Sequence, residues 1–145
     1  MDFFEKISFF WDADGVVKNL IEQWSPIGCS SEKDCEDSLY AFLHQKLDDV
    51  QIVRQYGRGR AQIDLMVNDS IMIELKFRLS SKSEYQRLVG QLIDYKEWGK
   101  NLIIVLVGET EPGLLKDLKK VVSREFGSFL LDSSANIIEK ATTVS

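Results

Sequence analysis

The chain has 145 residues, of which 44% are apolar and 28% charged, proportions that are ordinary for a soluble globular protein. This length suffices for one domain with a sizeable hydrophobic core. The longest apolar run, residues 102–107, is too short to cross a bilayer. The apolar start MDFFEKISFF carries acids and lacks a basic segment. We therefore expect no membrane partner and no signal peptide, and a cytoplasmic location.

Cysteine and histidine are scarce. The chain has two cysteines, Cys29 and Cys35, and one histidine, His44. This composition argues against a disulfide framework, a Cys/His zinc site and a Ser-His-Asp triad. Any bound metal would have oxygen ligands, which points to Mg²⁺ or Mn²⁺.

Charge is spread unevenly along the chain. The net charge of −5 argues against a generic nucleic-acid binder. Residues 1–49, however, carry eleven acids and four bases, whereas residues 54–87 carry seven bases and four acids. The second segment is either an ordinary solvated surface or a patch that binds a polyanion.

Helical spacing of apolar residues marks the first third of the chain. Residues 2–24 are expected to form one or two helices, with a break at residues 12–15. A further helix begins near Ser31, where Ser31-Glu32-Lys33-Asp34 fits a capping box, and its apolar stripe runs from Cys35 to Leu47. The N-terminal aromatic residues are expected to pack in the core, with a homodimer interface as the alternative (Phe3, Phe4, Phe9, Phe10 and Trp11).

Two features between residues 32 and 60 have a plain and a functional interpretation. Glu36 is either an acid favoured by the helix dipole or a carboxylate directed along the core toward the sheet. A first strand over residues 51–56 is followed by Gly57-Arg58-Gly59-Arg60. That segment is either a flexible turn or a loop whose glycines let the backbone approach phosphate while its arginines bind it.

Residues 61–77 read as a hairpin with a candidate cation site. Strict alternation predicts strands over residues 61–67 and 71–77, joined by a three-residue turn. Counting back from the turn places Asp64 opposite Glu74 and puts Lys76 on the same face. Two facing carboxylates destabilise a sheet unless one holds a proton or both bind a cation. The prediction depends on the register, because a slip of one residue would separate the two carboxylates.

The rest of the chain alternates helix and strand. We expect a helix over residues 81–98, a buried strand over 102–107, a helix from 110–113 to 126, and strands at 128–131 and near 137–138. The strand at 71–77 and that at 102–107 should be parallel. Gln91 and Tyr95 share a face of their helix, either as a surface glutamine and a half-buried tyrosine or as part of a site.

This pattern resembles the PD-(D/E)XK nuclease superfamily. The resemblance rests on Asp64, nine intervening residues, Glu74-Leu75-Lys76, a preceding helix with Glu36, and a following helix with Gln91. It covers the chain from the second helix onward and implies an α/β fold, a restriction-endonuclease-like mixed β-sheet core (α-β-β-β-α-β-α-β) flanked by helices. Residues 1–145 would form a single nuclease-like domain, with residues 1–28 as a helical extension packed on it. Ile63 stands where the family's name-giving proline would be.

The resemblance also implies roles for individual residues. Asp64, Glu74, Glu36 and the backbone carbonyl of Leu75 would bind Mg²⁺ or Mn²⁺. Lys76 would orient or activate the attacking water. Gln91 and Tyr95 match the Gln-x-x-x-Tyr element of the RecB-like branch, in which the glutamine supports the site and the tyrosine contacts the site or the DNA. The remaining candidates for DNA contact are basic (Arg58, Arg60, Arg78 and Lys82).

The predicted function is a Mg²⁺-dependent deoxyribonuclease that hydrolyses phosphodiester bonds, as an endonuclease. The alternatives are a non-catalytic module of the same fold that binds nucleic acid or protein, and a metal enzyme that acts on small phosphates. One site cuts one strand, so double-strand cutting at this size would require a homodimer.

Overall fold

The computed structural model describes residues 1–59, 61–127 and 134–142. Its elements follow the order α1 (Phe3–Trp11), α2 (Ala13–Gln23), α3 (Glu32–Lys46), β1 (Ile52–Arg58), β2 (Ala61–Val67), β3 (Ile71–Phe77), α4 (Lys82–Lys96), β4 (Asn101–Val107), α5 (Pro112–Phe126) and β5 (Ala135–Lys140).

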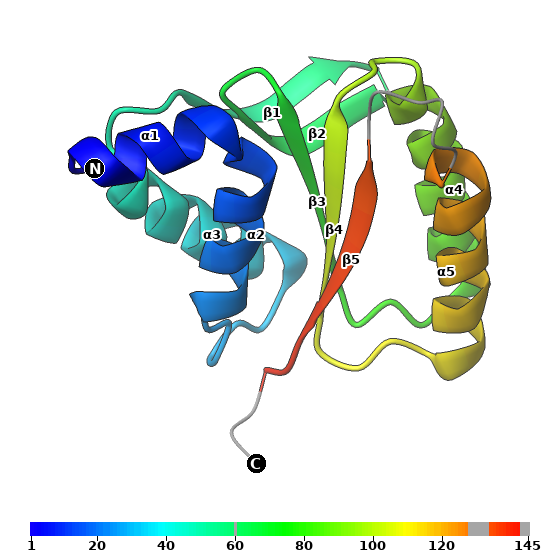
Figure 1. Cartoon of the computed structure of the whole chain (residues 1–145). Coiled ribbons are helices and arrows are strands. Elements are labelled where there is room, and N and C mark those ends of the chain that lie inside the picture. Colours follow the sequence, from blue (N-terminus) through cyan, green and yellow to red (C-terminus); the bar gives the residue numbers. More distant parts are fainter. Residues whose placement is uncertain (60, 128–133, 143–145) are drawn as a thin grey trace.

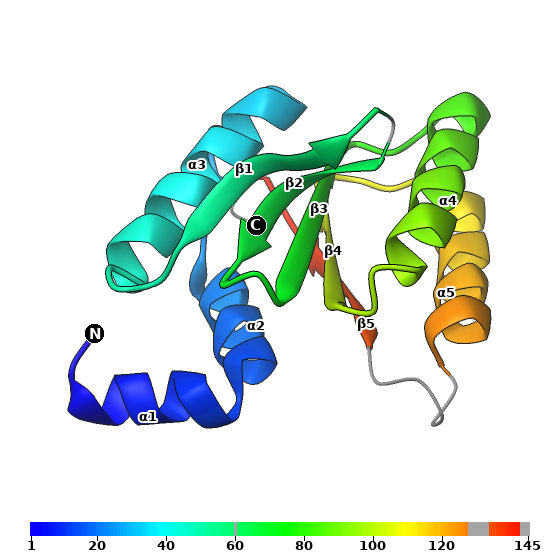
Figure 2. The ribbon, with the colours of Figure 1, turned by 90° about the horizontal axis from the view of Figure 1, so that it is seen from above.

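The sheet is mixed and has the strand order β1-β2-β3-β4-β5. Strands β1, β2 and β3 are antiparallel, whereas β3, β4 and β5 are parallel. Helices α1, α2 and α3 lie on one side of the sheet and α4 and α5 on the other (Figures 1 and 2). The structure confirms the predicted α/β fold class. It contains the predicted N-terminal helices and the crossover from β3 through α4 to β4.

Two hydrophobic clusters form the core, one on each face of the sheet. The first joins Val17, Ile21 and Trp24 of the N-terminal helices to α3 and to sheet residues such as Ile73. The second joins α4 and α5 to the opposite face, around residues such as Leu88. This division follows from the alternation of the central strands, which are buried on both faces and therefore apolar on both.

Capping residues set the helix boundaries. Asp12 ends α1 and caps α2 by accepting a hydrogen bond from the Gly15 N–H, which explains the break predicted at residues 12–15. Ser31 and Ser81 cap α3 and α4 through the N–H groups of Asp34 and Glu84. The last predicted strand is β5, while the strand predicted at 128–131 lies outside the described residues.

The hairpin between β2 and β3 has the predicted register. Val67 pairs with Ile71, Met66 with Met72 and Leu65 with Ile73. Asn68 and Asp69 make the turn at φ values of 52° and 53°, in the left-handed region that asparagine and aspartate tolerate.

Helix α1 corrects the expectation for the N-terminal aromatic residues. Phe9 is buried, but the other four are exposed by 70% to 81% of their surface (Phe3, Phe4, Phe10 and Trp11). The prediction that the aromatic residues pack in the core is therefore wrong for these four side chains. The reason is that α1 has aromatic residues on both faces, and its packing partner α2 covers only one of them.

Among the described residues, no helix combines the length and the apolar character needed to cross a membrane.

Candidate active site

The candidate site begins where β2 and β3 stop pairing. The ladder ends at Leu65 and Ile73, so the next pair in the same register, Asp64 with Glu74, is not formed. The Oδ2 atom of Asp64 instead accepts a hydrogen bond from the backbone N–H of Leu75 at 2.8 Å. A side-chain oxygen thus satisfies a strand N–H that has lost its ladder partner. The predicted proximity of the two acidic residues holds, although their backbones do not pair.

Glu74 is a buried acid, with only 2% of its surface exposed. Its Oε2 atom lies 2.8 Å from the hydroxyl oxygen of Tyr95. Burial raises the pKa of Glu74 well above its ordinary value, and a hydrogen bond with the Asp64 carboxyl and the charge of Asp64 raise it further. Lys76 and the Tyr95 hydroxyl act in the opposite direction and do not reverse the shift.

The Tyr95 hydroxyl links Glu74 to the backbone of β2. It lies 2.6 Å from the carbonyl oxygen of Gln62 and 2.8 Å from Glu74 Oε2. The hydroxyl has one proton, and the Gln62 carbonyl can only accept. The Tyr95 hydroxyl can therefore donate its proton to the Gln62 carbonyl or to Glu74 Oε2, and both acceptors lie within hydrogen-bonding distance.

Lys76 forms an ion pair that the sequence did not reveal. Its Nζ atom lies 3.5 Å from Oε1 of Glu32 in the first turn of α3, and only 14% of its side chain is exposed. Burial raises the pKa of Glu32. The positive charge of Lys76 lowers this pKa, and the negative charge of Asp64 raises it further, so that the net shift is upward. Glu32 lies four residues before Glu36, so both face the same side of α3. This spacing of four residues is the feature of the sequence from which a second acid on the same side of α3 could have been predicted.

Gln55 lies between the carboxylates of Glu36 and Asp64. Its Nε2 atom donates to Glu36 Oε1 at 3.0 Å and to Asp64 Oδ1 at 3.2 Å. Arg54 also approaches Glu36, with its Nη2 atom 3.5 Å from Oε1. Glu36 is therefore connected to Asp64 through one amide group.

The backbone of Gln55 is unusual for a strand residue. Its φ of 49° is left-handed, and the β1–β2 pairing passes from Arg54–Leu65 to Tyr56–Ile63 without a Gln55–Asp64 pair. Such a conformation costs roughly 1–3 kcal/mol and persists where the surroundings impose it. No feature of the sequence around Gln55 predicts this conformation.

The donor set of the cluster is chemically suited to a hard divalent cation. Asp64 and Glu74 are in hydrogen-bonding contact, and one of them is held toward its protonated form. A divalent cation would replace the shared proton and satisfy both carboxylates. As the side chains stand, no three acidic, histidine or cysteine residues of the described chain are grouped closely enough to hold an ion. The Asp64–Glu74 pair fits a cation, whereas Glu36 is kept apart by the Gln55 amide.

The supporting residues predicted on α4 lie at different depths. Tyr95 has no exposed surface, and its hydroxyl faces Glu74. The prediction that Tyr95 contacts DNA directly is therefore wrong, because a buried ring cannot reach the polymer. Its position agrees with the other predicted role, which is contact with the site. Gln91 lies one turn earlier on α4 and is half-buried.

The basic residues of the segment 54–87 fall into two groups, and the predicted DNA contacts belong to the second. Arg54 pairs with Asp37 and Glu36, and Lys76 with Glu32, so these two cations belong to the carboxylate cluster. Arg58, Arg78 and Lys82 are exposed, at the end of β1, after β3 and at the start of α4. Arg60 lies outside the described residues.

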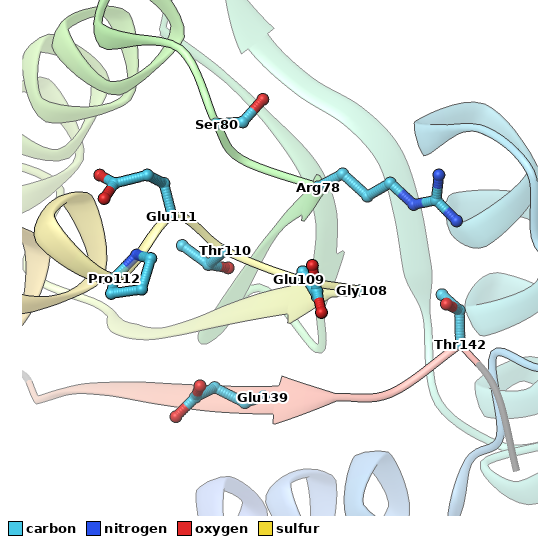
Figure 3. Close-up of a pocket in the computed structure, with 9 residues that line it drawn as sticks. All are labelled: Arg78, Ser80, Gly108, Glu109, Thr110, Glu111, Pro112, Glu139 and Thr142. Carbon is cyan, nitrogen blue, oxygen red and sulfur yellow. The ribbon is translucent and has the colours of Figure 1, made fainter. Parts of the chain in front are cut away.

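A cavity of about 1000 Å³ lies at the carboxyl ends of the parallel strands. Figure 3 shows its walls, with Arg78 from the segment after β3 and Glu109 and Glu111 from the segment after β4. Glu139 of β5 adds a third acid. Three carboxylates against one arginine do not make the positive surface that a polyanion requires, so Arg78 alone is the candidate DNA contact at this cavity.

Comparisons with known proteins are sparse. No family model matches the chain, and no curated protein sequence matches it. Among solved structures, SfsA of Pyrococcus furiosus in complex with Ca²⁺ is similar, with 15% sequence identity and a TM-score of 0.48. The alignment covers 76% of this chain and 58% of that one, so the chain spans less than two thirds of the SfsA structure. Similarity at this level carries no information about individual site residues.

Proposed function

We propose that this protein is a Mg²⁺-dependent deoxyribonuclease, an endonuclease that hydrolyses DNA phosphodiester bonds at the cluster of Asp64, Glu74 and Lys76. Mn²⁺ would serve the same role. One observation carries the proposal: two carboxyl groups are held in contact at the opening of a hairpin, one of them buried, with a lysine two residues further along the same strand. Carboxylates that are forced together in this way need a cation or a proton.

The residues of the cluster have distinct tasks in this proposal. A divalent cation bound by Asp64 and Glu74, with the Leu75 carbonyl as a further predicted ligand, would polarise the phosphate and lower the pKa of bound water. The predicted ligation by Glu36 requires the Gln55 amide to move from between Glu36 and Asp64. The Leu75 N–H fixes the direction of the Asp64 carboxylate. The Tyr95 hydroxyl fixes that of Glu74.

Lys76 supplies positive charge beside the reacting phosphate. Its ammonium group can donate hydrogen bonds to the attacking water and to the phosphate oxygens on which negative charge develops. Glu32 holds the Lys76 side chain at the rim of the cluster. Gln91, one turn before Tyr95, is the proposed support from α4, and the exposed Arg58, Arg78 and Lys82 are the proposed contacts to the DNA backbone.

The test is a Mg²⁺ titration of cleavage on linear, nicked, flapped and four-way DNA. Replacing Asp64, Glu74 or Lys76 by alanine should abolish metal-dependent cleavage while the protein remains folded. Asp117→Ala, which removes an exposed carboxylate on α5, should cleave like the unchanged protein. Robust cleavage by Glu74→Ala would rule out this assignment of the active site.

The second candidate is a non-catalytic module of the same fold that binds nucleic acid or protein. One observation favours it: side chains of the protein, Gln55 and Tyr95, already supply hydrogen-bond partners to the carboxyl groups. Absence of cleavage on every substrate with both Mg²⁺ and Mn²⁺, together with retained DNA or protein binding, would select this candidate.

A further inference from the structure

Helix α1 presents an apolar face to solvent. Phe3, Phe4, Phe10 and Trp11 are exposed by 70%, 77%, 81% and 79%, and Ile7 by 41%. Their spacing of three and four residues places them along one side of the helix. Phe9 points the other way into the core and anchors the helix. In Figures 1 and 2, α1 lies at the periphery of the molecule, far from α4 and α5.

The exposed area is large for a chain of this size. An aromatic side chain buries roughly 150–250 Å² in a core or interface, so the four aromatic residues expose on the order of 500–700 Å² together. Isolated soluble domains rarely leave a contiguous apolar patch beyond a few hundred Å² uncovered. A stable dimer needs about 800 Å² from each partner, which the patch and a polar rim together would supply.

A hollow lies beside these projecting side chains. Its volume is about 420 Å³, and it lies between α1, α2 and the end of α3. Phe4, Val16, Leu20 and Leu47 contribute apolar walls. One surface thus carries protruding aromatic rings beside a recess whose walls are partly apolar and partly polar, with Asp2, Glu5 and Lys46 among its polar lining residues. A two-fold interface brings a patch against its own copy, and therefore requires such self-complementarity.

The charges around the patch are partly compensated. Three acids near α1 have cationic partners: the N-terminal ammonium group pairs with Asp48, Lys6 with Asp49 at 3.0 Å, and Lys18 with Asp14 at 3.1 Å. Asp2 and Glu5 form the capping box of α1 by accepting hydrogen bonds from each other's backbone N–H groups. The rim that two copies would share is therefore partly neutralised.

We infer that α1 is the interface of a homodimer, in which the exposed aromatic face of one copy packs against the α1–α2 surface of a second copy. The interface contributes no residue to the carboxylate cluster. The dimer therefore does not depend on the proposed nuclease activity, and either proposal can fail without the other.

Analytical ultracentrifugation of the full chain over about a hundredfold range of concentration tests this inference, because a dimer shifts with concentration by mass action. The unchanged protein should pass from monomer to dimer. Phe10→Glu and Trp11→Glu should each raise the dissociation constant roughly thirtyfold or more, as loss of a central aromatic residue does. Ile93→Glu, which alters an apolar side chain on α4 that is 46% exposed, is the matched control and should dimerise normally.

Two further measurements keep the outcome clear. Circular dichroism checks that the glutamate variants fold. Tryptophan emission should shift to shorter wavelength as the unchanged protein dimerises, and Trp11→Phe should dimerise without most of that shift. A chain that stays monomeric throughout, a dimer that Phe10→Glu leaves intact, or a monomer that binds neutral phospholipid vesicles through α1 would each overturn the inference.

Discussion

The Asp64 carboxylate accepts a hydrogen bond from the backbone N–H of Leu75 at the point where β2 and β3 stop pairing. This bond lets the two strands part without leaving a buried donor unsatisfied. Parting in turn makes room for carboxylate groups between strands that would otherwise form a continuous ladder. One side chain therefore both maintains the sheet and supplies a candidate metal ligand.

These two roles of Asp64 can be separated by substitution. Asp64→Asn keeps an oxygen that can accept from Leu75, so stability should change little, yet the loss of charge should abolish cation binding and cleavage. Asp64→Ala should also be inactive and should lose about 1–3 kcal/mol of unfolding free energy, because the Leu75 N–H is left unsatisfied. Urea unfolding measures the difference between the two variants. Equal stability of both would show that the bond to Leu75 contributes nothing.

Tyr95 should act through Glu74 and not through DNA. Tyr95→Phe removes a hydroxyl that bridges Gln62 and Glu74, so we expect roughly 1–2 kcal/mol of destabilisation. Cleavage should show a lower kcat with a nearly unchanged KM, since the ring is buried and does not meet the substrate. Tyr85→Phe, on the same helix, is the control and should leave both constants unchanged. A KM effect without a kcat effect would restore a DNA-binding role for Tyr95.

The raised pKa of Glu74 predicts how the metal-free protein responds to pH. Because the folded state holds this proton more tightly than the unfolded state, the associated stability is fully present below the ordinary pKa of 4.5 and is lost as pH rises through the higher folded value. Without metal, Glu74→Gln should be more stable than the unchanged protein at neutral pH, and its stability should fall less with rising pH. Urea unfolding in a chelator across this range provides the test. Parallel pH profiles for the two proteins would contradict the assignment to Glu74.

The left-handed backbone of Gln55 predicts an inverted preference for glycine. In an ordinary strand, alanine is more stable than glycine by about 0.5–1 kcal/mol. At Gln55, with a φ of 49°, Gln55→Gly should be more stable than Gln55→Ala by on the order of 1 kcal/mol. The same pair of substitutions at Gln62, an exposed residue of β2, should give the ordinary order. Thermal unfolding of the four variants measures both differences, and an ordinary order at Gln55 would show that its backbone is not strained.

The elements and the hairpin register could be predicted because their causes are local. Capping residues such as Ser31 and Ser81 mark helix starts, and the turn at Asn68 and Asp69 sets the pairing of Val67 with Ile71. Alternation then brings Asp64 and Glu74 to neighbouring positions, and the candidate cluster follows from that register.

Other features depend on contacts between distant segments. The end of the ladder at Leu65, the bridging amide of Gln55 and the pairing of Lys76 with Glu32 each require the packed sheet and α3. The exposure of α1 was also beyond prediction, because helical periodicity does not tell which of two aromatic faces is covered. The depth of Tyr95 depends likewise on how α4 packs against the sheet.

The central claim, that Asp64 and Glu74 form a cation site, is tested most directly by calorimetric titration of the metal-free protein with Mg²⁺ and Mn²⁺. We expect saturable binding to the unchanged protein and to Asp117→Asn, and loss of binding in Asp64→Asn and in Glu74→Gln. Equal binding by all four proteins would show that the cation lies elsewhere and would rule out the Asp64–Glu74 site.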